Sequence, residues 1–288
     1  MYIIIKNRVL TLSKPSYIQQ SLFRMWALAK FELIRLFLTK RGMLAILAFI
    51  TTWFLILYYP VNSAVTIVAS DGFKGMAEDT FGILGLSALL QWQVAEFTIY
   101  WLIALYSFPI FALGASSDQT CADRTRGTLR FISLRATRNE IIFGRFIGQV
   151  LIIAILILLT LLATTTMAWL RESALGVPAL LKASDLFVQL IIVVLPFIAL
   201  TSFFNSFLRS AKLTSVVTLL FFGLGALFIS LISYNLSIAH YLNYIFPGVQ
   251  LSDIVGQDKL TLVHYSIPLI QTGCYLALAS IFMKRSAL

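Results

Sequence analysis

Long apolar runs separated by short polar segments dominate the chain. Six of these runs are close to the roughly 20 residues that a helix needs to cross a bilayer. They cover residues 43–60, 97–116, 142–169, 185–208, 213–234 and 263–283. The runs are continuous rather than alternating, which favours membrane-spanning helices over the strands of a transmembrane barrel. The pattern therefore predicts an all-α integral membrane protein with six transmembrane helices.

A further periodic segment, residues 17–41, precedes the first span. Its apolar residues recur at helical spacing: Leu22, Trp26, Ala29, Leu33 and Leu36. The segment carries too many charges to cross a bilayer, so it predicts an amphipathic helix lying in the cytoplasmic interface. A soluble helix packed on a partner is the alternative. Residues 1–42 then form an N-terminal region, and residues 43–288 form the six-helix transmembrane domain.

Composition and charge fit this architecture. Hydrophobic residues make up 59% of the chain and charged residues 12%, whereas soluble domains are about 25% charged. If the N-terminus is cytoplasmic, eighteen of the 22 lysines and arginines lie inside and four outside, as the positive-inside rule requires. Both termini are then expected in the cytoplasm. The net charge of +10 faces anionic lipid and a cytosolic partner, because no nucleic-acid-binding motif accompanies it.

The most basic segment, residues 117–141, lies between the second and third spans. It holds five arginines and a sixth, Arg145, follows. An arginine at the bilayer centre costs about 2.5–3.5 kcal/mol, so the segment must lie outside the hydrocarbon. Leu129, Ile132 and Ser133 recur on one side, and Asp123 stands near the expected helix start. This predicts one short amphipathic helix suited to protein docking; a loop needed only for topology is the alternative.

Two longer segments, residues 61–96 and 235–262, lie on the opposite side. Both alternate apolar and polar residues and carry aromatic residues suited to the headgroup boundary. This leaves two readings open, short helices in the outer leaflet or plain loops. Glu96 and Asp185, at the outer ends of spans, are expected to be solvated.

Polar residues inside the spans are few. The candidates for lining a path are Gln189, Asn205, Thr218 and Gln271, and hydrogen bonding between helices is the alternative and more frequent role of such residues. Gly144 and Gly148 have a spacing that predicts close helix packing. The sequence contains no recognisable catalytic constellation and no metal-ligand spacing, so we do not expect the chain by itself to be an enzyme or to bind a metal.

The basic segment resembles the signature of ABC-2-type transporter permeases. The resemblance is carried by D-R-T-R-G-T-L-R-F-I-S-L and by R-N-E-I-I-F-G-R, at the start of the third span. The matching positions are Asp123, Gly127, Thr128, Leu129, Ile141, Gly144 and Arg145. The segment ALAKFELIRLFLTKRG resembles the interfacial elbow helix of that family. Ala136 departs from the pattern, because a proline is common there, and Arg130 and Arg135 make the loop more basic.

The resemblance implies a transmembrane permease subunit of an ATP-binding-cassette exporter in a bacterial inner membrane. A separate ATPase, in two copies, would dock on the loop as on a coupling helix, at Asp123, Arg126, Gly127, Thr128, Leu129, Arg130 and Phe131. The chain has no G-x-x-x-x-G-K-[ST] motif, so no cofactor is expected in it, and ATP and Mg belong to the partner. A second permease chain, identical or a close paralogue, would complete the pathway. The alternative is a mechanical transmitter that relays ATPase motion to a periplasmic partner without moving a solute.

Overall fold

The computed structural model describes residues 4–5, 8–9, 17–73, 75, 89, 92–233, 237–251, 254 and 261–285. These residues are almost wholly helical, apart from an antiparallel pair of two-residue strands, β1 (Ile4–Ile5) and β2 (Arg8–Val9). Six helical segments are long and apolar enough to cross a membrane. This confirms the predicted all-α, six-span fold class.

The N-terminal helices meet at a sharp break. Helix α1 (Tyr17–Leu38) ends one residue before Thr39, and α2 (Lys40–Ile56) begins one residue after it. The Thr39 hydroxyl accepts a hydrogen bond from the Gly42 backbone N–H at 3.1 Å, which satisfies one of the free donors of a helix start. Helix α2 continues into the π-helical turn η1 (Leu57–Val61), which contains Pro60, and then into α3 (Ala64–Ala69).

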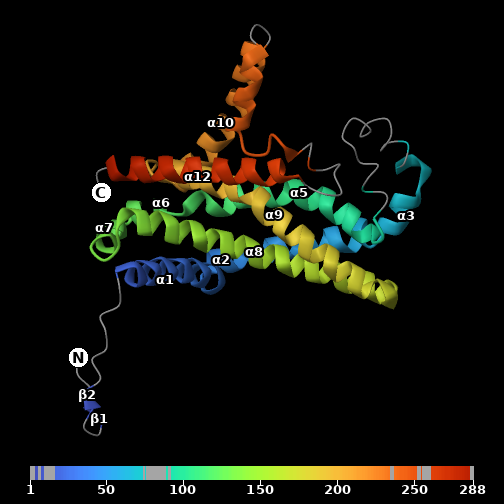
Figure 1. Ribbon diagram of the computed structural model, residues 1–288, viewed down its shortest axis with the longest axis horizontal. Coiled ribbons are helices and arrows are strands. Elements are labelled where there is room, and N and C mark those ends of the chain that lie inside the picture. The colour runs from blue at the N-terminus through green and yellow to red at the C-terminus, as the bar shows by residue number, and fades with distance from the viewer. Residues whose placement is uncertain are drawn as a thin grey trace.

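Four long helices form the bundle: α5 (Ala95–Ala115), α8 (Arg138–Arg171), α9 (Gly176–Asn205) and α12 (Leu262–Arg285). They run together along the long axis of the molecule (Figure 1). The short helix η5 (Ser173–Leu175) joins α8 to α9. Prolines lie inside α5, α9 and α12, whereas α8 has none. Helix α8 is therefore the longest uninterrupted rod in the bundle.

The chain between α5 and α8 is built from short helices. They are η4 (Ser116–Asp118), α6 (Cys121–Thr125) and α7 (Thr128–Ser133). We expected a short amphipathic helix that starts near Asp123. Helix α7 is a short helix with Leu129 buried and Phe131 exposed, but it begins only at Thr128, because the chain breaks at Gly127, whose φ of 72° lies in the left-handed region. Glycine enters that region without the steric penalty that a side chain brings.

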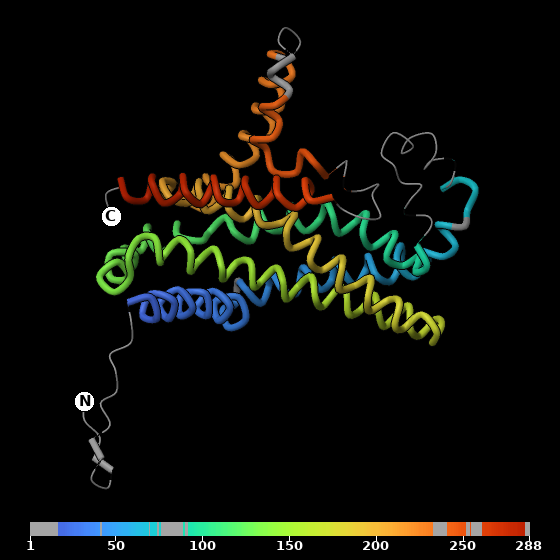
Figure 2. Tube along the Cα trace, in the orientation of Figure 1, coloured from blue at the N-terminus to red at the C-terminus, as the bar shows by residue number. Residues whose placement is uncertain are grey.

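Helix α10 (Ala211–Ser233) leaves the bundle at a steep angle (Figures 1 and 2). It is the least covered of the six spanning candidates, with 11% of its most apolar window buried. The 3₁₀ helix η6 (Ser237–Ile245) follows it and leads back to the bundle. There the Gln271 amide donates to the carbonyl oxygens of Tyr244 and Phe246, at 2.7 and 3.2 Å. The described part of segment 235–262 thus contains the short helix η6, whose end is held to α12 by Gln271. Segment 61–96 is described at 61–73, 75, 89 and 92–96, where it contains the short helix α3 and the first residues of α5.

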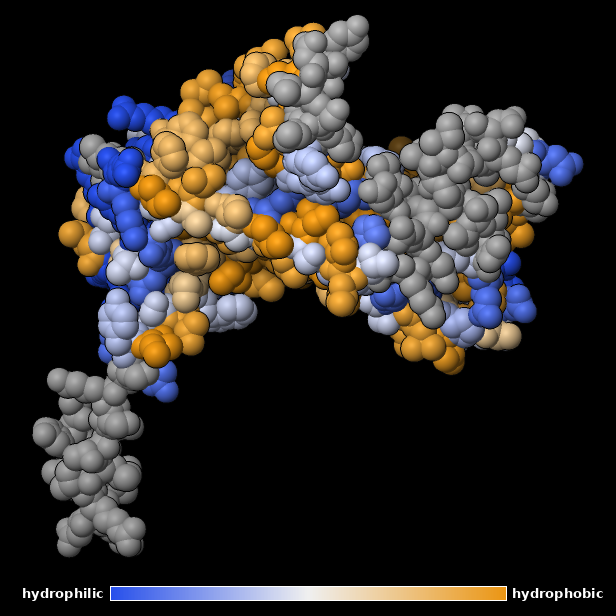
Figure 3. Space-filling view, turned by 45° about the horizontal axis from the view of Figure 1, so that its top comes forward, coloured by the Kyte–Doolittle hydropathy of each residue, from blue (hydrophilic) through white to orange (hydrophobic). Residues whose placement is uncertain are grey.

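Polar and apolar surfaces separate along the molecule. Figure 3 shows hydrophilic residues gathered at the end that carries the α5–α8 connection and again at the opposite end, with hydrophobic residues between them. At that opposite end, the first turn of α5 meets the last turn of α8. Glu96 is 3% exposed there and accepts two hydrogen bonds from Arg171, at 2.6 and 3.0 Å. The expectation that Glu96 is solvated was wrong, because Arg171 supplies the counter-charge.

Candidate functional site

The connection between α5 and α8 is fixed at its end by the helix that follows. Thr137 caps α8: its hydroxyl accepts from the Glu140 backbone N–H at 3.3 Å, and the Glu140 carboxylate accepts from the Thr137 backbone N–H at 2.7 Å. Such a capping box satisfies two orphan donors at once. Arg24 of α1 lies 3.6 Å from the same carboxylate. The beginning of α8 is thereby fixed to the connection before it and to α1.

Two arginines, Arg124 in the connection and Arg138 at the first position of α8, bind the ends of distant helices. Arg124 donates to the backbone carbonyls of Ser206 and Leu208, just after α9, at 2.7 and 3.3 Å. Arg138 donates to the backbone carbonyls of Met283 and Lys284 in the last turn of α12, at 2.6 and 2.7 Å. The last carbonyls of a helix have no partner within it and carry partial negative charge. Arg124 therefore joins the connection to the end of α9, and Arg138 joins the beginning of α8 to the end of α12.

A third arginine, Arg145, lies inside the protein. It is 1% exposed, and its guanidinium bonds both Glu32 of α1 and Asp123 of α6. Glu32 is also 1% exposed and receives further contacts from Arg35 at 3.2 Å and from the Gln149 amide at 3.1 Å. We call these five residues the Arg145 cluster. Its two carboxylates and two guanidiniums balance in charge, as burial requires.

Close packing of α1 on α8 brings the Arg145 cluster together. A Cβ added at Gly144 would lie 2.8 Å from the Leu28 Cβ, and one added at Gly148 would lie 2.8 Å from the Glu32 Cβ. Ala29, between these two α1 residues, is fully buried. The small-residue spacing noted in the sequence therefore marks a real helix contact.

The opposite side of the connection is open. Phe131 is 72% exposed and Leu134 is 82% exposed. Arg126, Arg130 and Arg135 are exposed beside them. Within the described part of the chain, no hydrogen bond or ion pair engages these three guanidiniums. We call these five residues the basic face.

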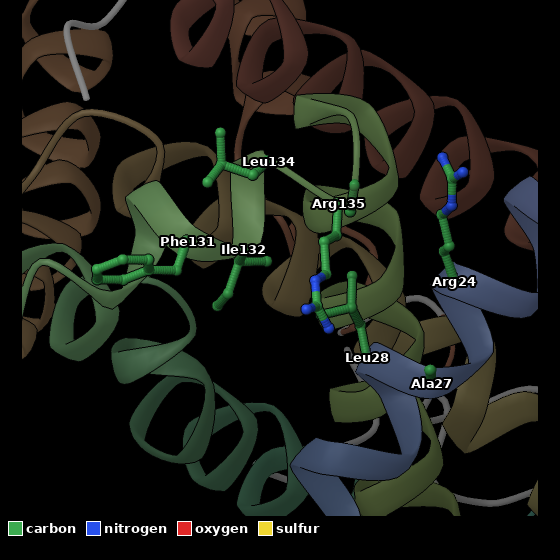
Figure 4. Close-up of a pocket in the computed structure, with 8 residues that line it drawn as sticks. Arg24, Ala27, Leu28, Phe131, Ile132, Leu134 and Arg135 are labelled. Carbon is green, nitrogen blue, oxygen red and sulfur yellow. The ribbon is translucent and has the colours of Figure 1, made fainter.

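A shallow cleft of about 490 Å³ adjoins the basic face. Helix α1 contributes Arg24, Ala27 and Leu28 to it, and the connection contributes Phe131, Ile132, Leu134, Arg135 and Ala136. In Figure 4, Ile132 and Leu28 come from the two facing segments, and the Arg135 side chain extends toward α1. The cleft is mainly apolar and has arginines at its edge.

The residues predicted for ATPase docking divide between the two sides. Arg126, Arg130 and Phe131 belong to the basic face. The other four shape the connection. Leu129 is 2% exposed, the Thr128 hydroxyl donates to the Asp123 carboxylate at 3.1 Å, Gly127 makes the turn, and Asp123 binds Arg145.

The residues predicted to line a path are all engaged within the chain. The Asn205 amide donates to the carbonyls of Ser116 and Thr201, and Gln189 donates to Asp185. Thr218 donates to a carbonyl of its own helix, and Gln271 donates to carbonyls at the end of η6 and just after it. Their role in a path stays a prediction. No group of three His, Cys, Asp or Glu side chains suited to a metal ion is found in the described ranges.

Sequence reasoning missed Glu32, Arg35, Leu134 and Arg135 as parts of this site. One signal was present: Glu32 follows Ala29 by three residues, so it falls on the apolar stripe of an otherwise basic helix. A carboxylate on a buried helix face needs a counter-charge. The sequence does not reveal that the counter-charge lies 113 residues away.

Comparison with known proteins agrees with the arrangement. A family described as "ABC-2 family transporter protein" matches residues 26–281. A comparison with curated proteins gives no match. The matched region begins in α1 and ends within α12, so it takes in the first five spanning candidates, most of the sixth, the Arg145 cluster and the basic face. The chain therefore belongs to the ABC-2 family of transporter proteins.

Proposed function

We propose that the chain, as the permease subunit of an ABC transporter, works in export and is driven by a separate ATPase that docks on the basic face. The single observation that carries the proposal is how the arginines divide. Arg124, Arg138 and Arg145 hold the connection to the rest of the protein, whereas Arg126, Arg130 and Arg135 have no partner within the described chain. Exposed arginines beside an exposed Phe131 form the kind of surface that protein interfaces favour.

The proposed partner surface follows from the chemistry of the basic face. The three exposed guanidiniums would bind carboxylates on the ATPase, and Phe131 and Leu134 would enter an apolar pocket between those carboxylates. In the full complex we propose two ATPase copies, each supplying ATP and Mg, and two permease chains. The connection would lie in the cytoplasm, with both chain termini on the same side. This orientation in a bacterial inner membrane rests on the eighteen-to-four distribution of basic residues.

Co-purification tests the docking proposal. A tagged chain is extracted from its native membranes in mild detergent, and associated ATP hydrolysis is measured. We expect the double variant Arg126→Glu, Arg130→Glu to lose at least about tenfold of this activity, because two reversals of charge face the same acidic surface. Lys212→Glu, at the exposed start of α10, is the matched control and should retain it. Equal recovery of ATPase with all three chains would refute the docking proposal.

A second candidate function, mechanical transmission, is favoured by the far end of the bundle. Helix α8 has 34 residues and α9 has 30, or about 51 and 45 Å at 1.5 Å per residue, against about 30 Å of hydrocarbon. Near their junction Leu170, Val177 and Leu181 are 83%, 71% and 67% exposed. An outer protein could bind there.

Measuring ATP consumption and solute movement with the purified complex in sealed vesicles distinguishes the two functions. Export predicts solute movement coupled to ATP consumption. Transmission predicts ATP consumption without solute movement, together with an outer protein that co-purifies and is lost when Leu170 and Val177 are changed to Glu.

A further inference from the structure

Asp123 is the one acidic residue of α6, yet it faces away from the basic face. Its carboxylate is 14% exposed and is bonded by Arg145 from α8 and by Thr128 from α7. Each of the two Asp123 carboxylate oxygens already accepts a hydrogen bond from within the chain, and little of the side chain is exposed to a partner. Its position indicates a link between the connection and the bundle.

Arg145 makes that link continuous. One guanidinium nitrogen bonds Asp123 of α6 and another bonds Glu32 of α1, while the side chain itself belongs to α8. The guanidinium is planar and presents its donors in a fixed fork, so the positions of the two carboxylates are set relative to one another. The Phe31 ring, with its centroid 5.2 Å from the guanidinium carbon, covers the group further.

The contacts around Arg145 leave little freedom for α1 and α8 to move apart. Gly148 brings the two backbones close, and the Gln149 amide donates to the same Glu32 carboxylate that Arg145 binds. Arg35 bonds Glu32 and also donates to the backbone carbonyl of Asp118 in η4, at 3.0 Å. Three segments separated in sequence are thus tied through charged groups rather than through apolar contact alone.

We infer that Arg145 is the positioning residue of coupling: through Asp123 and Glu32 it makes the connection, α1 and α8 move as one body when the docked ATPase displaces the basic face. This inference rests on the proposed function and deepens it. Asp123 then takes no part in ATPase binding. Because α8 has no internal proline or break, the displacement of its beginning reaches its far end, and the helix is about 51 Å long.

A reporter at the far end of α8 tests this inference. The chain carries Cys121→Ser and Cys274→Ala, with Leu170→Cys as the only thiol, because Leu170 is 83% exposed. Maleimide labelling of the chain in complex with its ATPase is measured with and without ATP, Mg and vanadate. We expect nucleotide to change the labelling rate severalfold in this parent chain.

Two variants remove the link by different routes. Asp123→Asn removes one charge and keeps the shape, and Arg145→Lys keeps the charge but replaces the fork by a single ammonium. We expect both to bind the ATPase as the parent does and to lose the nucleotide-dependent change in labelling. Asp123→Glu should restore it. Asp118→Asn is the matched control, because the Asp118 side chain accepts a hydrogen bond from the Ala122 backbone N–H, a role that asparagine also fills.

The outcomes separate the two proposals. If no ATP-hydrolysing subunit co-purifies with the parent chain, the proposed function fails. If the ATPase binds and Asp123→Asn keeps a full nucleotide response, the inference about Arg145 fails while the docking proposal stands. It fails equally if Asp123→Asn abolishes ATPase binding, or if the parent shows no nucleotide response at Leu170.

Discussion

At the scale of single residues, the arginines in and near the connection have different structural roles. Arg124 and Arg138 satisfy helix-end carbonyls, and Arg145 neutralises two carboxylates inside the protein. Arg126 and Arg130 remain exposed. The positive-inside rule predicts that all of them belong to the cytoplasmic side, but it does not distinguish those that stabilise the fold from those available to a partner.

The first prediction compares one buried and one exposed arginine. Arg145→Leu leaves Glu32 and Asp123 without their shared counter-charge, and breaking a buried pair in this way costs about 3–5 kcal/mol. Arg130→Leu removes an exposed group without a partner in the described chain, so the stability should change by only about 0.5 kcal/mol. Thermal unfolding of the detergent-solubilised chain measures both. Equal shifts in melting temperature would show that the Arg145 cluster does not support the fold.

At the scale of elements, the contact of α1 with α8 organises the site. Helix α1 was expected in the membrane interface, and the structure shows what its other face does. Ala29 and Glu32 are buried against the glycines of α8. Without that contact, Glu32 would not reach Arg145, and the connection would lose its link to the N-terminal region.

The second prediction tests this helix contact with two glycines. In Gly148→Ala the new methyl group would lie 2.8 Å from the Glu32 Cβ and 3.1 Å from the Ala29 Cα, so α1 must shift, at a cost of about 1–3 kcal/mol. Gly114→Ala, in α5, meets nothing within 4 Å and should stabilise its helix by about 0.5–1 kcal/mol. Opposite shifts in melting temperature are expected. A rise with both variants would contradict the close approach of α1 and α8.

The sequence predicted those features that depend on residues close to one another along the chain. Apolar runs follow from the thickness of the bilayer, and the glycine spacing of α8 follows from helix periodicity. The sequence shows a glycine at position 127, but not that this glycine adopts a left-handed conformation. That conformation depends on the direction in which the chain must turn between α6 and α7. The Glu32–Arg145 pair and the Arg171–Glu96 pair join residues 113 and 75 positions apart. Contacts at such separations come from tertiary packing, which no periodicity encodes.

At the scale of the whole molecule, the chain has two polar ends joined by an apolar body (Figure 3). One end holds α7, the end of α12 and the beginning of α8 (Figure 1). The other holds the Glu96–Arg171 pair. In the proposed function, the ATPase displaces the first end in the cytoplasm and the second end moves in response.

The third prediction tests the orientation of the chain in the membrane. Leu134→Cys, in a chain carrying Cys121→Ser and Cys274→Ala, places a thiol at a position that is 82% exposed on the basic face. An impermeant maleimide should label it in inside-out vesicles and leave it unlabelled in intact cells. Leu170→Cys, at the far end of α8, should show the reverse pattern. Labelling of both thiols from the same side would contradict the proposed topology.

Photo-crosslinking from the basic face tests the central claim most directly. A benzophenone maleimide is attached to Leu134→Cys, and for comparison to Ile110→Cys, which is 70% exposed on α5. After illumination of native membranes, we predict that Leu134 is joined to a polypeptide that binds ATP and that Ile110 is not. If Leu134 yields no ATP-binding adduct, or if Ile110 yields the same one, the basic face is not where the ATPase docks.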